Sequence, residues 1–71
     1  MSIPITELEQ AINFWRTRRP SQGEEHTLSA EVAALAAPYA LLIFTGRSAI
    51  EPAELSEPAW AAYEAWRREA A

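Results

Sequence analysis

The sequence predicts an all-α protein, a compact bundle of about four short helices with one apolar helix at its centre. Three observations support this fold class. Every acidic residue is glutamate and every basic residue is arginine, and together with abundant alanine they favour helices over turns. Apolar residues recur at spacings of three and four near both ends of the chain. Between those segments, residues 32–44 carry no charge, and a helix that is apolar on all sides must be covered by others.

The first helix is expected over residues 6–19. Thr6 and Glu9 have the spacing of a capping box, in which each side chain bonds the backbone of the other. Pro20 ends the helix because proline has no amide hydrogen. Residues 3–5 precede the helix as a short extended lead-in. The apolar side of the helix is formed by Leu8, Ala11, Ile12 and Trp15.

Pro38 lies inside the uncharged segment and decides how many helices it contains. Proline removes one backbone hydrogen bond and disfavours helical geometry in the preceding residue. The sequence therefore favours a break, with one helix over residues 29–37 and a second, central helix over residues 38–45 that ends at Gly46. A single kinked helix is the alternative, and a buried strand is an alternative for the last apolar residues.

The last helix is expected to begin after Ser56, which can cap it. The connection over residues 47–56 contains one helical turn near residues 52–55. Acidic and proline residues directly after Ser56 suit a first helical turn. An aromatic stripe on this helix, together with Trp15, is expected to close over the central helix; it comprises Trp60, Tyr63 and Trp66.

The composition limits the protein to one small domain, residues 1–71. A chain of this length buries only about 60% of its unfolded surface, so it depends on good helix packing or on a partner. With no cysteine and one histidine, we expect no disulfide, no metal site and no cofactor. The start of the chain lacks the pattern of a signal peptide, which predicts a cytoplasmic location. The uncharged segment is shorter than the roughly 18 residues of a membrane span, so no membrane association is expected.

The candidate binding residues gather at the end of the first helix and in the following loop. Arginines beside an aromatic ring can bind phosphates or carboxylates and can stack on bases. A histidine flanked by glutamates could act as a base or a ligand, although one histidine without a second histidine or a nucleophile makes a poor site. The candidate surface comprises Trp15, Arg16, Arg18, Arg19, Glu25 and His26.

Three functions compete for these residues. The favoured one is a non-enzymatic protein–protein interaction module with a protein partner or a weak homodimer, which predicts an exposed aromatic patch of more than a few hundred Å². The alternative is a nucleic-acid-binding or regulatory accessory protein, which needs the arginines, including Arg47, Arg67 and Arg68, to converge on one face despite a net charge of −4. An enzyme built around His26 and Glu25 is the least favoured.

Several motifs together resemble a family of short Gram-negative bacterial proteins catalogued as a domain of unknown function. The most specific are Trp15-Arg16, Pro20-Ser21, Gly23-Glu24-Glu25-His26 and Pro38-Tyr39-Ala40. The resemblance spans nearly the whole chain. It implies a small, stand-alone, mostly helical cytosolic protein and supplies no catalytic residues.

Overall fold

The computed structural model describes residues 2–18 and 30–70. Within them it contains three α-helices, one short 3₁₀ helix and a two-stranded sheet, so the mainly helical fold is confirmed and the fourth α-helix is not. The elements in chain order are β1 (Ile3–Pro4), α1 (Ile5–Arg18), α2 (Ala30–Thr45), β2 (Ala49–Ile50), η1 (Pro52–Glu54) and α3 (Glu57–Ala70).

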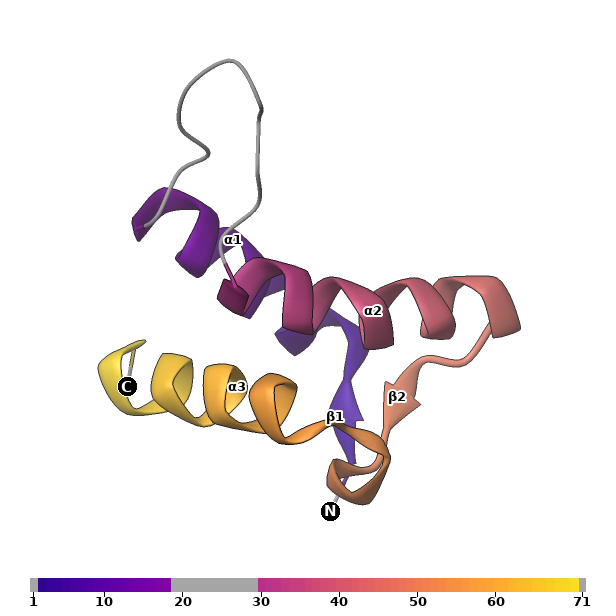
Figure 1. The fold of residues 1–71 in the computed structure, drawn as a ribbon. Coiled ribbons are helices and arrows are strands. Elements are labelled where there is room, and N and C mark those ends of the chain that lie inside the picture. Colours follow the sequence, from indigo (N-terminus) through magenta and orange to yellow (C-terminus); the bar gives the residue numbers. More distant parts are fainter. Residues whose placement is uncertain (1, 19–29, 71) are drawn as a thin grey trace.

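The three α-helices pack against one another, and their directions matter for the surfaces described below. α1 and α3 both leave the strand pair and run toward the same side of the molecule, while α2 runs back in the opposite direction (Figure 1). Each α-helix contacts the other two. The C-terminal ends of α1 and α3 are therefore neighbours, and the C-terminal end of α2 points away from them.

The short lead-in forms β1 and pairs with β2, an element that the sequence did not predict. The pairing is antiparallel, with Ile3 opposite Ile50, and both side chains are almost completely buried. The amide of Ile5 donates a 2.8 Å hydrogen bond to the carbonyl of Ser48. Because this bond satisfies a donor at the helix start, α1 begins at Ile5, and the predicted start at Thr6 is wrong by one residue.

Pro38 neither breaks nor ends the helix: α2 is continuous through it, and the predicted break is wrong. An interior proline costs a helix about 3 kcal/mol. Leu35 and Leu42 lie on either side of Pro38 and are both fully buried. Removing one such leucine from a core costs about 2–5 kcal/mol. A break that redirected either half of α2 would lose one of these anchors, so packing outweighs the local preference.

The predicted helix ends on both sides of the β2 segment are confirmed. Gly46 has a φ of 71°, which a residue without a side chain adopts at no cost. The amides of Gly46 and Arg47 bond back to the carbonyls of Ile43 and Leu42, the two bonds of a Schellman motif. The Ser56 hydroxyl accepts a 3.3 Å hydrogen bond from the Ala59 amide and caps α3. The single helical turn between them is η1.

The core lies between the three α-helices and the strand pair. Its buried side chains are Ile3, Leu8, Ala11, Trp15, Val32, Leu35, Leu42, Ile50, Ala59, Ala62 and Tyr63. Trp60 and Trp66 pack against it and are only partly buried. Near the C-terminal end of α2, Leu41, Ile43 and Phe44 are 47, 59 and 89% exposed. The expectation that this helix is covered on every side is therefore wrong.

Candidate functional site

Trp15 serves the packing of α1 on α3. Its side chain is 6% exposed, and its indole Nε1 donates a 3.1 Å hydrogen bond to the Ala62 carbonyl. The ring of Phe14 meets it edge-on, with 5.3 Å between centroids. A buried indole with its N–H satisfied contributes to stability. Trp15 therefore supplies almost no accessible surface to a partner.

The arginines of α1 and α3 gather at one end of the molecule. Arg16 and Arg18 are exposed. Arg18 forms a 2.5 Å ion pair with Glu69 of α3, and its guanidinium lies 5.5 Å from the centre of the Phe14 ring. Arg67 lies 5.9 Å from the ring centre of Tyr63. Arg47 follows the opposite end of α2, so the described arginines do not all share one face (Figure 1).

The other predicted site residues, Arg19, Glu25 and His26, lie outside the described residues. The candidate surface from Trp15 to His26 therefore stays a prediction. Of its described members, Arg16 and Arg18 are accessible and Trp15 is not.

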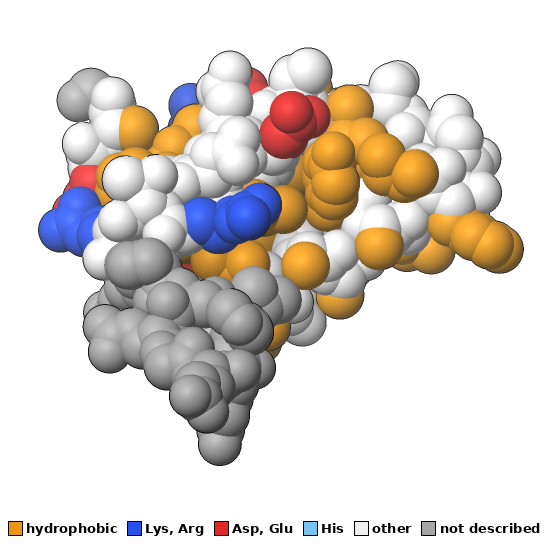
Figure 2. All heavy atoms as spheres, turned by 90° about the horizontal axis from the view of Figure 1, so that it is seen from above, with side chains coloured by type: hydrophobic (Ala, Val, Ile, Leu, Met, Phe, Trp, Pro, Cys, Tyr) orange, Lys and Arg blue, Asp and Glu red, His pale blue; other side chains and the backbone are white. Residues whose placement is uncertain are grey.

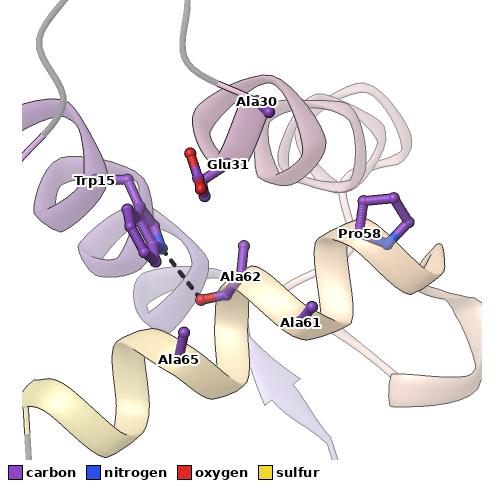
Figure 3. Close-up of a pocket in the computed structure, with 7 residues that line it drawn as sticks. All are labelled: Trp15, Ala30, Glu31, Pro58, Ala61, Ala62 and Ala65. Carbon is purple, nitrogen blue, oxygen red and sulfur yellow. Dashed lines mark hydrogen bonds between the residues drawn. The ribbon is translucent and has the colours of Figure 1, made fainter.

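A hollow of about 270 Å³ lies where α1, α2 and α3 meet (Figure 3). Alanines of α3 form its floor, and the Trp15 indole and the Glu31 carboxylate face it from the other two helices. Its lining residues are Trp15, Ala30, Glu31, Pro58, Ala61, Ala62 and Ala65. Acid–base catalysis by carboxylates usually needs two groups held in different environments. Among the described residues, the lining contributes one carboxylate, that of Glu31, and otherwise consists of the Trp15 indole, alanines and a proline.

Tyr63 joins α3 to α1 through its hydroxyl group. The hydroxyl donates to a Glu7 carboxylate oxygen at 2.5 Å and accepts a longer 3.5 Å contact from Arg67. Burial, followed by the hydrogen bond to Glu7, raises the pKa of Tyr63 above its usual value. The phenol is therefore held protonated, and the contact acts as a clamp between two helices.

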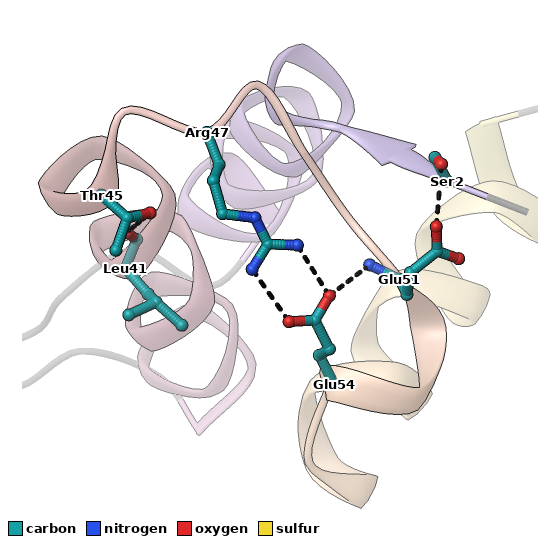
Figure 4. A network of polar contacts seen from close by, with 6 residues as sticks. All are labelled: Ser2, Leu41, Thr45, Arg47, Glu51 and Glu54. Atoms are coloured by element: carbon teal, nitrogen blue, oxygen red, sulfur yellow. Dashed lines mark hydrogen bonds and ion pairs between the residues drawn. The ribbon is translucent and has the colours of Figure 1, made fainter.

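Arg47 and Glu54 hold the connection between α2 and α3 in place (Figure 4). Two nitrogens of the Arg47 guanidinium donate to the two carboxylate oxygens of Glu54 at 2.9 and 2.8 Å. The Glu51 amide donates to the same carboxylate at 2.9 Å, and Ser2 donates to the Glu51 side chain. The hydrogen bond from Arg47, followed by that from Glu51, lowers the pKa of Glu54 to about 2. Glu54 therefore stays ionised to strongly acidic pH.

The outer face of α2 is the surface that sequence reasoning missed. We define it as Ala37, Ala40, Leu41 and Phe44, all exposed and spaced so that they share one side of the helix. Figure 2 shows hydrophobic side chains along the half of the molecule where α2 ends; the basic side chains of this view lie in the other half, and one acidic side chain lies beside the hydrophobic group. The spacing was visible in the sequence. Its meaning as an exposed face was missed because every apolar residue of this segment was expected to be covered.

A second hollow, of about 230 Å³, adjoins this face. Ala37, Pro38 and Leu41 contribute to it from α2. The opposite side is formed by Ile50, Glu54, Leu55 and Ser56. The outer face of α2 therefore includes both projecting side chains and a recess.

Within residues 2–18 and 30–70, no group of three or more acidic, histidine or cysteine side chains is placed to hold a metal ion. In the same residues, no helix combines the length and apolar content needed to cross a bilayer. A cytoplasmic location stays a prediction.

The fold and its surfaces define a small, mainly helical domain with one exposed apolar helix face. Residues 1–68 match a family described as "Protein of unknown function (DUF3717)", and the chain belongs to that family. This confirms the resemblance drawn from the tryptophan–arginine and proline–tyrosine motifs, while a Gram-negative origin stays a prediction. No curated protein and no solved structure matches the chain.

Proposed function

We propose that this protein is a non-enzymatic protein–protein interaction module that binds through the outer face of α2. The observation that carries the proposal is the 89% exposure of Phe44, beside the exposed side chains of Leu41 and Ile43. Burying a large apolar side chain contributes about 1.5–3 kcal/mol. Exposed apolar patches of several hundred Å² commonly mark binding surfaces on monomers. A partner that covers Phe44 gains this free energy, which the fold itself leaves unused.

The C-terminal turns of α2, which present this face, are held in place by the core and by the following turn, and this favours binding. Leu42 is fully buried between exposed neighbours and anchors the last turns of α2 to the core. The turn after α2 is closed by the Schellman motif at Gly46 and by the pair between Arg47 and Glu54. A preorganised helix loses little conformational entropy when it docks. Side chains spaced like those of the outer face are the usual anchors of helix recognition.

The test compares two surfaces in one experiment. Tagged wild type, Phe44→Ser and Arg16→Ser are used to recover companions from a nuclease-treated lysate of the natural host. We expect a protein companion that is retained by Arg16→Ser and lost by Phe44→Ser. Circular dichroism must show that both variants keep their helices. Loss of the companion with Arg16→Ser alone would assign binding to the end of α1. Retention of the companion by both variants would show that neither surface binds it.

Nucleic-acid binding is a second candidate, and one observation favours it. Because α1 and α3 run in the same direction and are joined by the Arg18–Glu69 ion pair, their terminal arginines share one end of the molecule. Against it, Glu69 neutralises part of this charge, Arg47 is elsewhere and the net charge is −4. A phosphate-binding surface needs a basic excess. This candidate therefore ranks second.

Its test is the salt dependence of binding to a short labelled single-stranded DNA, followed by fluorescence anisotropy. Binding through arginines should weaken steeply between about 50 and 200 mM salt. The Arg68→Gln variant should bind less tightly, and Arg47→Gln should match wild type. Equal effects of the two substitutions, or no binding at low salt, would exclude the arginine end as a nucleic-acid site.

A further inference from the structure

We propose that the occupant of the outer face of α2 is the same face of a second copy, packed antiparallel about a two-fold axis. This inference rests on the proposed function and names its partner. Four properties of the face bear on this occupant: the order of its large and small side chains, the adjoining recess, its charge and its area.

The order of side chains is self-complementary. Ala37, Ala40, Leu41 and Phe44 follow one another at intervals of three, one and three residues, which read the same in both directions. In an antiparallel pair centred between Ala40 and Leu41, Phe44 of each copy lies opposite Ala37 of the other. Leu41 likewise lies opposite Ala40. A two-fold interface requires this reciprocity, and each large side chain here meets a small one.

The recess beside Ala37 is large enough for the incoming ring. It measures about 230 Å³, and its lining combines the apolar Pro38, Leu41, Ile50 and Leu55 with the polar Glu54 and Ser56. An apolar cavity of about 150 Å³ accommodates benzene. The antiparallel arrangement brings Phe44 of one copy to the edge of this recess on the other. The most exposed large apolar side chain of the described residues thus faces a recess with a mainly apolar lining.

The charge of the face also fits a second copy. The chain carries a net charge of −4, so two copies repel each other over most orientations. Residues 32–44 carry no charge, and Glu54, which lines the recess, is paired with Arg47. A strongly basic or acidic partner finds no countercharge on this face. A neutral apolar surface needs no countercharge, and the identical face of a second copy is such a surface.

The area sets the strength of the pair. A nearly fully exposed phenylalanine, a half-exposed leucine and two exposed alanines together offer roughly 300–400 Å² per copy. Two copies then bury roughly 600–800 Å², below the 1,200 Å² at which stable interfaces begin. The dimer is therefore weak and reversible, with a dissociation constant of roughly 0.1–1 mM.

Two measurements test the pairing. Sedimentation equilibrium from about 20 µM to about 2 mM should show a monomer–dimer equilibrium for wild type and a monomer for Phe44→Ser. The chain contains no cysteine, so single cysteines report contacts cleanly. Ala40→Cys, next to the two-fold axis, should form a disulfide-linked dimer under mild oxidation. Ala33→Cys, at another exposed alanine of α2, is the matched control and should not, because its two copies lie roughly 22 Å apart along the helix axis.

The outcomes separate this inference from the proposed function. A monomer at every concentration, with Ala40→Cys linking no faster than Ala33→Cys, overturns the homodimer. If Phe44→Ser still abolishes recovery of a different protein, the interaction surface stands and its occupant is another chain. If Phe44→Ser changes neither association nor recovery, both proposals fail. Linking of Ala40→Cys that is lost on adding Phe44→Ser supports the antiparallel pair.

Discussion

The more apolar helix, α2, exposes a large aromatic side chain, whereas the more highly charged helix, α3, buries one. α2 has no charged residue after Glu31, yet Phe44 near its end is 89% exposed. α3 contains several charged residues, yet its Tyr63 is 1% exposed and is the largest fully buried side chain of the described residues. The number of apolar residues on a helix is thus a poor guide to its burial. What decides burial is how many sides of the helix meet another element.

The largest expected effect comes from the buried aromatic residue of α3. Tyr63→Ala removes a ring that lies 5.7 Å from the rings of both Trp60 and Trp66, together with the hydroxyl bond to Glu7. We expect a loss of about 3–5 kcal/mol in the free energy of unfolding. Urea denaturation followed by tryptophan fluorescence measures it. A loss below about 1 kcal/mol would show that the Tyr63 side chain contributes little to the stability of the core.

Pro38→Ala should act in the opposite direction. It restores an amide donor inside α2 and removes the contact of the ring with the preceding turn. Part of the gain is offset because alanine leaves the unfolded chain more freedom than proline does. We expect a net stabilisation of about 1–2 kcal/mol, measured by thermal unfolding. Destabilisation would mean that the proline ring, which lines the recess, contributes more by packing than it costs in the helix.

The stabilisation that the Arg47–Glu54 pair contributes should depend on pH. The folded-state pKa of Glu54 is about 2, below its ordinary value of 4.5, so ionised Glu54 stabilises the fold above about pH 4.5. That contribution is lost as the pH falls toward 2. We expect Glu54→Gln to lower the melting temperature at pH 7 and to match wild type near pH 2. The same substitution at Glu64 is the control, and a difference between wild type and Glu54→Gln that persists near pH 2 would contradict the assignment.

The smallest expected effect is that of Phe44→Ala. Replacing a buried aromatic residue costs several kcal/mol, whereas this exposed one should change the free energy of unfolding by less than about 0.5 kcal/mol. Urea denaturation at low micromolar concentration, where a weak dimer is dissociated, measures the monomer alone. A loss comparable to that of Tyr63→Ala would show that the outer face is part of the core.

The helix boundaries were largely predictable because local chemistry sets them. Gly46 and Ser56 act within one turn of their own position, so the sequence identifies them directly. The strand pair was not predictable, because two residues cannot display an alternating pattern. The continuity of α2 through Pro38 depends on burial of Leu35 and Leu42, which is a property of the assembled core. Local preference alone could not reveal it.

The candidate site residues likewise divide into those that the sequence identifies and those that only the assembled fold identifies. Arginines at the ends of α1 and α3 are recognisable from sequence, and the ion pair of Arg18 with Glu69 adds only the partner. The burial of Trp15 and the exposure of Phe44 depend on which side of each helix meets a neighbour. Residues that are chemically similar thus received opposite roles. Only the arrangement of the three helices distinguishes them.

The pairing of Ile3 with Ile50 has a consequence for the order in which the chain assembles. During synthesis on the ribosome, Ile3 emerges before α1 and α2, and its partner Ile50 follows only after both helices have been made. The helices can form from local contacts within microseconds, but pairing of β1 with β2 closes a loop that contains both α1 and α2. We therefore expect β1 to join the fold later than α1 and α2, although it precedes both in the chain.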